Sequence, residues 1–344
     1  MKKFLLLFLL TFSFSSHAEF FRLEQSIPLQ RSLGANELAV IINSADPLSA
    51  TLGEYYAAKR KIPRKNVIYI SFPPGDKVMS KETFATIKKQ VDEATPFNVQ
   101  AYALTWVAPF RVDCMSITTA FAMGFDPDFC AHGCQQTRTN PYFNSTSRRP
   151  WSDFGIRPTM SIAATSLHKG ITLIRKGVEA DFSFPTGTGY LVSTNDKNRN
   201  VRSHFYPNLM KKISPLFSVE RVNKNTLKDK DDVFFYITGL THIDGLETLN
   251  FLPGAIADHL TSAGGVLTGS GQMSALRWLE AGATGSYGAV VEPCNFPQKF
   301  PHPTVLMQHY LNGDTLIEAY WKSVSWPGQG IFIGEPLAKP FSLF

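Results

Sequence analysis

Short apolar runs alternate with amphipathic segments through the first third of the chain. The β-branched, apolar runs at residues 37–43, 66–72 and 101–107 predict three strands. Between them, apolar positions recur at helical spacing in residues 49–61 and 81–94, and Pro63 stops the first of these helices. Strands that alternate with helices at this pace predict a parallel sheet with crossover helices.

The alternation breaks off at Cys114 and resumes at Thr159. Residues 114–158 are rich in Asn, Ser, Pro, Gly and Cys, and so long a connection is typically functional or held by disulfides. Beyond it, helices and strands are again predicted in turn. The predicted helices are 159–176, 204–213, 252–263, 273–281, 305–311 and 314–325, and the predicted strands are 189–194, 217–222, 233–238, 265–268 and 285–291.

This pattern predicts an α/β protein with a parallel-rich sheet and flanking helices. Two α/β halves divide near residue 185, and a single sheet continuous through both halves is compatible with the pattern. We expect four segments along the chain: a signal peptide at 1–18, an N-terminal α/β subdomain at 19–113, a Cys-containing insertion and helix at 114–184, and a C-terminal α/β subdomain at 185–344.

The first eighteen residues have the pattern of a secretory signal peptide. Lys2 and Lys3 precede an apolar run from Phe4 to Phe12, and Ala18 completes a cleavage-site pattern before Glu19. The apolar run is too short to cross a bilayer and no later run is long enough. We therefore expect a periplasmic or secreted protein, with no stable membrane span after the signal is cleaved.

Charge excludes one class of partner. Cleavage removes two lysines and no acidic residue, so the formal net charge falls from +6 to +4. The remaining excess is scattered along the chain and forms no basic cluster. We therefore expect no nucleic-acid binding, and a peptide, a glycan or another protein of the cell envelope is the expected partner.

Four cysteines would meet an oxidising compartment, where an even number favours disulfides. The close spacing of Cys130 and Cys134 predicts a disulfide that closes a tight loop; metal binding is the alternative, but its four-ligand pattern is incomplete. Pairing of Cys114 with Cys294 is then the simplest remainder, although four cysteines allow three connectivities. We expect no metal and no cofactor.

Three polar loops follow predicted strands of the second half, at residues 239–245, 269–272 and 292–295. In an open α/β sheet the ligand crevice lies at the carboxyl ends of the strands, and neighbouring strands are about 4.8 Å apart. If the three strands are adjacent and parallel, His242, Ser270 and Glu292 project from one edge. Such a group supports either catalysis or ligand binding.

The catalytic interpretation makes His242 the base, Ser270 or Cys294 the nucleophile, and Glu292 or Asp244 the orienting carboxylate. Ser270 lacks the Gly-x-Ser-x-Gly spacing of a nucleophile elbow, and a disulfide would make Cys294 inert.

The binding interpretation needs only exposed polar groups and close backbone approach. Arginines after strands are suited to bind a carboxylate or another anion, although each alone is as well explained by a surface ion pair. The residues assigned to ligand binding are Gly269, Gly271, Gln272, Asn295, Arg111, Asp113, Asp196 and Arg199, and Arg202 is a further candidate for the anion.

The segment LPGAIADHLTSAGGVLTGSGQMSALRWLEAGATGSYGAVV (252–291) resembles the catalytic half of the caspase-like peptidases, gingipains included. In that group one strand ends in His-Gly and the next ends in the nucleophilic Cys. Here residues 241–245 occupy the His loop with the His-Gly pair interrupted, and residues 269–271 take the place of the nucleophile without a Cys. The resemblance implies a caspase-like fold, and the missing Cys argues against cysteine peptidase activity.

A second resemblance extends over nearly all of the mature chain. The runs IPRKNVIYI (62–70), RPTMSIAATS (157–166), FPTGTGYLVSTND (184–196), VEPCNFPQKFPHP (291–303) and GDTLIEAYWKSVSWPGQGIFIGEPLAKPF (313–341) are similar to an uncharacterised family of exported bacterial proteins. That family occurs in genomes with exosortase, a membrane protein-sorting transpeptidase. The resemblance implies an accessory binding protein of the cell envelope, linked to exosortase-type sorting or exopolysaccharide systems; the alternative is a hydrolase or peptidase that uses His242 with Ser270 or Cys294.

Overall fold

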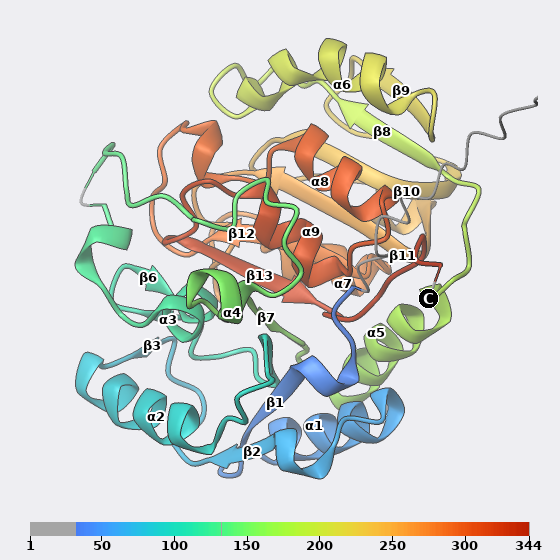
Figure 1. The fold of residues 1–344 in the computed structure, drawn as a ribbon. Coiled ribbons are helices and arrows are strands. Elements are labelled where there is room, and N and C mark those ends of the chain that lie inside the picture. The colour runs from blue at the N-terminus through green and yellow to red at the C-terminus, as the bar shows by residue number, and fades with distance from the viewer. Residues whose placement is uncertain (1–31, 132, 344) are drawn as a thin grey trace, which may run out of the picture. The chain divides into compact units, whose positions relative to one another are not determined.

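The computed structural model describes residues 32–131 and 133–343, and the predicted signal peptide lies outside them. A ten-stranded sheet holds these residues together, with the strand order β2-β1-β4-β7-β13-β12-β11-β10-β8-β9 (Figure 1). Its strands are β1 (Leu38–Asn43), β2 (Val67–Ile70), β4 (Ala101–Leu104), β7 (Thr159–Ser161), β8 (Thr188–Val192), β9 (Ser218–Val222), β10 (Lys230–Gly239), β11 (Leu249–Leu260), β12 (Gly285–Ala289) and β13 (Gly330–Gly334). A second sheet has the order β3 (Val78–Met79), β5 (Arg111–Val112) and β6 (Met115–Ser116).

Helices flank the large sheet, as Figure 1 shows. They are α1 (Pro47–Arg60), α2 (Lys81–Ala94), α3 (Ile117–Met123), α4 (Pro150–Phe154), α5 (Leu167–Ala180), α6 (Tyr206–Ile213), α7 (Leu276–Ala281), α8 (Pro303–Leu311) and α9 (Leu316–Ser323). α1 packs beside α5, and α8 packs between α6 and α9. The predicted α/β fold with a mostly parallel sheet and flanking helices is confirmed. No helix of the described residues is long and apolar enough to cross a membrane.

Local signals in the sequence explain where the longer helices begin. The side chains of Asp46, Ser80 and Ser166 each accept a hydrogen bond from a backbone N–H in the first turn of the helix that follows. These caps satisfy donors that a helix start would otherwise leave unpaired. α1 ends at Lys61, which adopts a left-handed conformation with φ 53°.

One antiparallel contact divides the sheet into two directions. β13 runs antiparallel to β12, whereas the other neighbouring pairs of the large sheet are parallel. The carboxyl ends of β8, β10, β11 and β12 therefore lie together at one edge, which we call the C-half edge. The carboxyl ends of β1, β2, β4 and β7 lie at the opposite edge, so residues that follow those strands do not reach the C-half edge by strand direction alone.

Three predicted elements are wrong. Residues 252–260 of the predicted helix at 252–263 belong to β11, and the predicted strand at 265–268 is a loop. The predicted helix at 159–176 is β7, a short loop and residues 167–176 of α5. β11 is buried from Gly254 to its end, so it lacks the alternation that marks a half-buried strand. Its pairing also slips, because Val233 pairs with Phe251 and Phe235 with Ile256, which leaves Pro253 and Gly254 in an irregular stretch.

Candidate functional site

Four loops meet at the C-half edge, because β8, β10, β11 and β12 are parallel and adjacent. They span residues 193–199, 240–245, 261–275 and 290–296. Eleven of the fourteen residues that the sequence singled out lie in these loops: Asp196, Arg199, His242, Asp244, Gly269, Ser270, Gly271, Gln272, Glu292, Cys294 and Asn295.

A chain of hydrogen bonds joins two of these loops, and we call it the Thr261 chain. Arg199 Nη1 pairs with Asp196 Oδ2 at 2.9 Å, and Arg199 Nε donates to Thr261 Oγ1 at 3.2 Å. Thr261 Oγ1 in turn donates to Gln272 Oε1 at 2.7 Å. Gln272 Oε1 also accepts from the backbone N–H of Ala263 at 2.9 Å. The structure thus brings together Asp196, Arg199 and Gln272 around Thr261, which the sequence analysis did not select.

Ser270 closes its own loop and does not join His242. Its hydroxyl donates to the carbonyl of Ala263 at 3.4 Å and accepts from the N–H of Gln272 at 3.0 Å. His242 and Asp244 are exposed, and among the described residues their side chains make no hydrogen bond or ion pair. No hydrogen bond within residues 32–131 and 133–343 therefore connects Ser270, His242 and Glu292 as a catalytic group.

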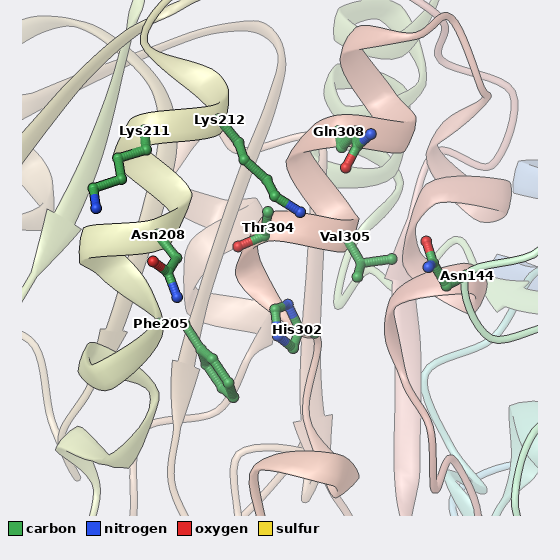
Figure 2. Close-up of a pocket in the computed structure, with 9 residues that line it drawn as sticks. All are labelled: Asn144, Phe205, Asn208, Lys211, Lys212, His302, Thr304, Val305 and Gln308. Atoms are coloured by element: carbon green, nitrogen blue, oxygen red, sulfur yellow. The ribbon is translucent and has the colours of Figure 1, made fainter.

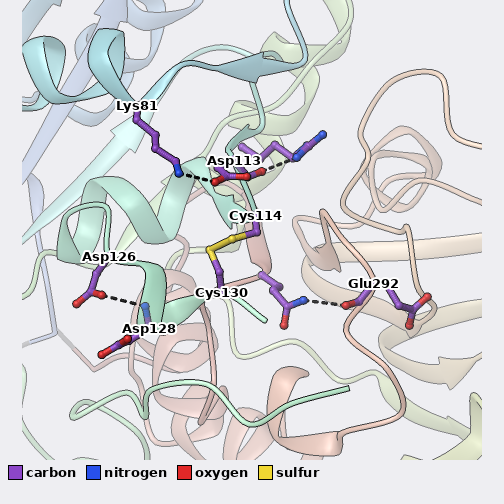
Figure 3. The surroundings of a disulfide bond; sticks show 9 residues. Lys81, Asp113, Cys114, Asp126, Asp128, Cys130 and Glu292 are labelled. Atoms are coloured by element: carbon purple, nitrogen blue, oxygen red, sulfur yellow. Dashed lines mark hydrogen bonds and ion pairs between the residues drawn. A yellow bond between two sulfur atoms is a disulfide. The ribbon is translucent and has the colours of Figure 1, made fainter. Parts of the chain in front are cut away.

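The predicted disulfide pairs are wrong. Cys114 bonds to Cys130, and Cys134 bonds to Cys294; the Cα atoms are 5.4 Å apart in each pair. Figure 3 shows the first pair, in which Cys114 follows β5 and Cys130 follows a short 3-10 helix at Pro127–Phe129. Cys130 and Cys134 were expected to pair because they are close in sequence, but folding brings Cys134 against Cys294 in the loop after β12. Cys294 therefore has no thiol, and its assignment as a nucleophile is wrong.

Glu292 and Asn295 flank this disulfide at the surface. One carboxylate oxygen of Glu292 accepts from the N–H of Cys294 at 2.8 Å. The backbone carbonyl of Glu292 accepts from Gln329 Nε2 at 2.8 Å, which is the dashed line at Glu292 in Figure 3. Both side chains are exposed. Glu292 therefore shapes the turn that carries Cys294, which adopts a left-handed conformation with φ 54°.

Arg111 and Asp113 lie outside the four loops. Arg111 is in β5 of the small sheet, and its guanidinium donates to the backbone carbonyl of Asp113. The Asp113 carboxylate pairs with Lys81 Nζ at 2.7 Å, and both side chains are about half exposed (Figure 3). Asp113 is thus one half of a surface ion pair with Lys81, whereas the contact of Arg111 is a hydrogen bond to a backbone carbonyl.

A buried ion pair lies just behind the C-half edge, between Asp258 of β11 and Arg202 of a 3-10 helix at Asn200–Phe205. Arg202 pairs with Asp258 at 2.5 Å, and the two side chains are 2% and 1% exposed. Arg202 Nη2 also donates to the carbonyl of Thr238 at 2.7 Å. Burial raises the pKa of Asp258, and the Arg202 guanidinium opposes that rise. Arg202 thus serves the interior and is not exposed to an external anion.

His259 is the next residue of β11 and faces the other side of the sheet. Its Nδ1 accepts from Trp278 Nε1 at 2.9 Å, so its Nε2–H donates to the carbonyl of Met273 at 3.0 Å. Burial lowers the pKa of His259 to about 3. His259 therefore stays neutral and anchors the 261–275 loop to its strand. The sequence analysis did not select Asp258 or His259. The signal that could have identified them is an Asp-His pair inside an apolar run, but residues 252–263 were interpreted as a helix.

No protein-family model and no curated protein sequence matches the chain. Among solved structures, that of the Arg specific cysteine proteinase gingipain R is similar to it, with a TM-score of 0.52 and 9% sequence identity. The similarity covers 90% of this chain and 79% of the other. It confirms the caspase-like fold. At this identity the similarity establishes the fold alone, so any activity has to be argued from the side chains.

The observed end of β11 differs from the predicted strand end, so a different residue follows the strand. The strand that follows the 240–245 loop is β11, not the predicted strand at 265–268, and β11 ends at Leu260. The first residue beyond it is Thr261, the centre of the Thr261 chain, whereas Ser270 lies further along the same loop.

Proposed function

We propose that this chain is a peptidase-related scaffold of the cell envelope that binds a polypeptide segment at the C-half edge without hydrolysing it. The observation that carries the proposal is the state of the possible nucleophiles. The four cysteines are bonded to each other in pairs, and the hydroxyl at the end of β11 donates its hydrogen bond to an amide oxygen and not to a base.

Catalysis by a cysteine nucleophile is excluded because every cysteine is bonded to another. All four cysteines of the chain form disulfides, so none can supply the thiolate that attacks a peptide carbonyl. Cys294, the one cysteine at the C-half edge, is bonded to Cys134.

The hydroxyl route fails for lack of a proton acceptor. Attack by an alcohol requires a neighbouring base to take its proton. The proton of Thr261 points at the amide oxygen of Gln272, which is not a base, and a guanidinium donates to the hydroxyl oxygen. The nearest ring in sequence, that of His259, has both nitrogens engaged elsewhere. Thr261 is also fully buried.

The surface of the 261–275 loop supports binding. Gly269 and Gly271 are exposed, and a side chain added at Gly271 would meet no atom within 4 Å. The Lys77 ammonium lies over Gly269, so Gly271 is the position beside Ser270 where another backbone can approach closely. Exposed His242 and Glu292 on the neighbouring loops add hydrogen-bonding groups of both kinds.

Sequence and disulfides support the cellular context. The signal-peptide pattern and the second resemblance point to an exported protein in an exosortase-containing envelope, and two disulfides fit an oxidising compartment. On this basis we assign the scaffold an accessory role in protein sorting or exopolysaccharide systems.

Catalysis is tested on purified residues 19–344 with their disulfides intact. We expect no covalent adduct with a fluorophosphonate or with an epoxide-based cysteine probe, and no cleavage of a random peptide library by mass spectrometry. Peptide cleavage or an adduct on Ser270 or Thr261 that is lost in His242→Ala would show an enzyme and overturn the proposal.

Binding is tested by selecting peptides from a displayed library and measuring their affinity by calorimetry. We expect Gly271→Val to weaken the selected peptides at least about tenfold, equivalent to about 1.4 kcal/mol, because its side chain occupies the approach path. The same variant should keep the unfolding midpoint of the wild type, since the added side chain has free space. Equal affinity for both proteins would place the binding surface elsewhere.

A further inference from the structure

A pocket of about 380 Å³ lies between α6 and α8, away from the Thr261 chain. Figure 2 shows side chains of α6 and the residue before it on one side, the first turns of α8 on the other, and Asn144 beyond α8. Its volume falls within the range of about 300–1,000 Å³ that small-ligand sites occupy. The lining residues are Asn144, Phe205, Asn208, Lys211, Lys212, His302, Thr304, Val305 and Gln308.

The charge of the lining selects an anion. It contains no Asp or Glu, and Lys212 extends from α6 toward α8, whereas Lys211 points away (Figure 2). Among the described residues Lys212 forms no ion pair, so its charge is available. The start of α8 adds to the field, because Thr304 and Val305 form its first turn and no side chain caps it. An uncapped helix start presents free N–H groups and a partial positive charge.

The neutral polar groups select a ligand that has hydroxyl groups as well as charge. Asn208 and Gln308 are exposed, and among the described residues their amides make no hydrogen bond. The Nδ1 atom of His302 is buried and likewise has no partner there. Each amide can donate and accept at once, which matches a sugar hydroxyl, whereas a simple anion only accepts.

The lining also contains the ring of Phe205, which contacts the ring of His204 with centroids 3.7 Å apart. Phe205 packs against His302 with ring centroids 4.1 Å apart, and both side chains are only partly exposed. In Figure 2 the Phe205 ring lies near Asn208, and Gln308 lies across the pocket on α8. The part of the Phe205 ring that stays exposed, together with the amides and Lys212, suits a ligand ring that carries hydroxyls and a carboxylate.

We propose that this pocket binds an acidic sugar residue of a saccharide, with its carboxylate at Lys212 and the start of α8 and its hydroxyls at the amides. The site is separate from the C-half edge, so it stands whether or not that edge binds a polypeptide. Its ligand class is a uronic acid-type saccharide, recognised through charge and hydroxyl groups together.

Calorimetry on residues 19–344 tests the proposal with four probes: tetragalacturonate, maltotetraose, tetraglutamate and inorganic phosphate. We expect tetragalacturonate to bind at least tenfold more tightly than each of the other three. Lys212→Ala should weaken it about tenfold or more, since a hydrogen bond to a charged group is lost. Val305→Glu, which puts a carboxylate into the lining, should abolish binding.

Lys224→Ala is the matched control, because it removes the same charge from an exposed position outside the pocket and should leave the affinity unchanged. Equal binding of tetraglutamate or phosphate would show an anion site without sugar selectivity. Equal binding of maltotetraose would show that charge has no role. An equal loss in Lys224→Ala, or no binding of tetragalacturonate, would also overturn the proposal.

Discussion

His259 is the residue whose environment makes the sharpest prediction about pH. Its ring lies buried between Trp278 and the carbonyl of Met273, and burial lowers its pKa from the ordinary 6.5 to about 3. Below pH 6.5 the unfolded chain takes up a proton there that the native protein does not. The contribution of this residue to stability is therefore complete above pH 6.5 and declines as the pH falls toward 3.

Between pH 7 and pH 5 this single group should lower the free energy of unfolding by about 2 kcal/mol. Urea unfolding of the wild type and of His259→Gln at both pH values measures the effect. The variant should be less stable than the wild type at pH 7. Between pH 7 and pH 5, however, its free energy of unfolding should fall by about 2 kcal/mol less than that of the wild type.

His242→Gln is the control, since it removes an exposed imidazole and keeps the buried one. Should His259→Gln not fold, the ring resonances of His259 can be followed by NMR in the wild type. A ring that titrates near pH 6.5 in the native protein would contradict the buried, neutral state.

At the scale of elements, the C-half edge depends on a close backbone contact at the end of β10. A side-chain carbon added at Gly239 would lie 1.9 Å from the carbonyl oxygen of Arg199, which no repacking of side chains can relieve. Gly239 thus lets the residues after β8 pack onto β10 and sets the position from which Arg199 reaches Thr261. Thr194 supports the same contact by donating to the carbonyl of Gly239 at 2.7 Å.

Gly239→Ala should therefore lower the free energy of unfolding by about 1–3 kcal/mol, the usual cost of overpacking. Gly271→Ala is the matched control, because its added carbon meets nothing within 4 Å, and it should change stability by less than about 0.5 kcal/mol. Urea unfolding of the two variants decides the point. Equal losses in the free energy of unfolding would show that the backbone near Arg199 shifts to accommodate the added carbon without destabilising the protein.

The elements that the sequence predicted well are those with one clear periodicity. The strand at 37–43 and the helix at 81–94 are observed almost as expected, as β1 and α2. β11 was mistaken for a helix because Pro253 and Gly254 interrupt a strand that is buried on both faces further on. That error moved the expected end of the strand from Leu260 to Thr268, so Thr261 was passed over while Ser270 was selected.

At the scale of the whole molecule, the sequence could predict that disulfides form but not which cysteines pair. Pairing depends on where the insertion crosses the loop after β12, and this is a long-range property with no local signal in the chain. The contacts of the candidate site are long-range as well, and the sequence could not predict them for the same reason. Its loops were expected at one edge from strand order, whereas the hydrogen bonds between Arg199, Thr261 and Gln272 depend on side chains that only folding brings together.

The two disulfides give the last prediction, because their Cα–Cα distances are the same while their loop lengths differ tenfold. Cys114 and Cys130 are 16 residues apart, and Cys134 and Cys294 are 160 apart. A cross-link stabilises mainly by restricting the unfolded chain, more strongly for a longer loop. Loop entropy predicts a loss of about 3 kcal/mol on replacing the first pair by alanines and about 5 kcal/mol for the second. Urea unfolding of both double variants, without reductant, measures the two losses. Equal losses, or a larger one for Cys114 and Cys130, would show that the insertion is stabilised by its native contacts and not by the restriction of the unfolded chain.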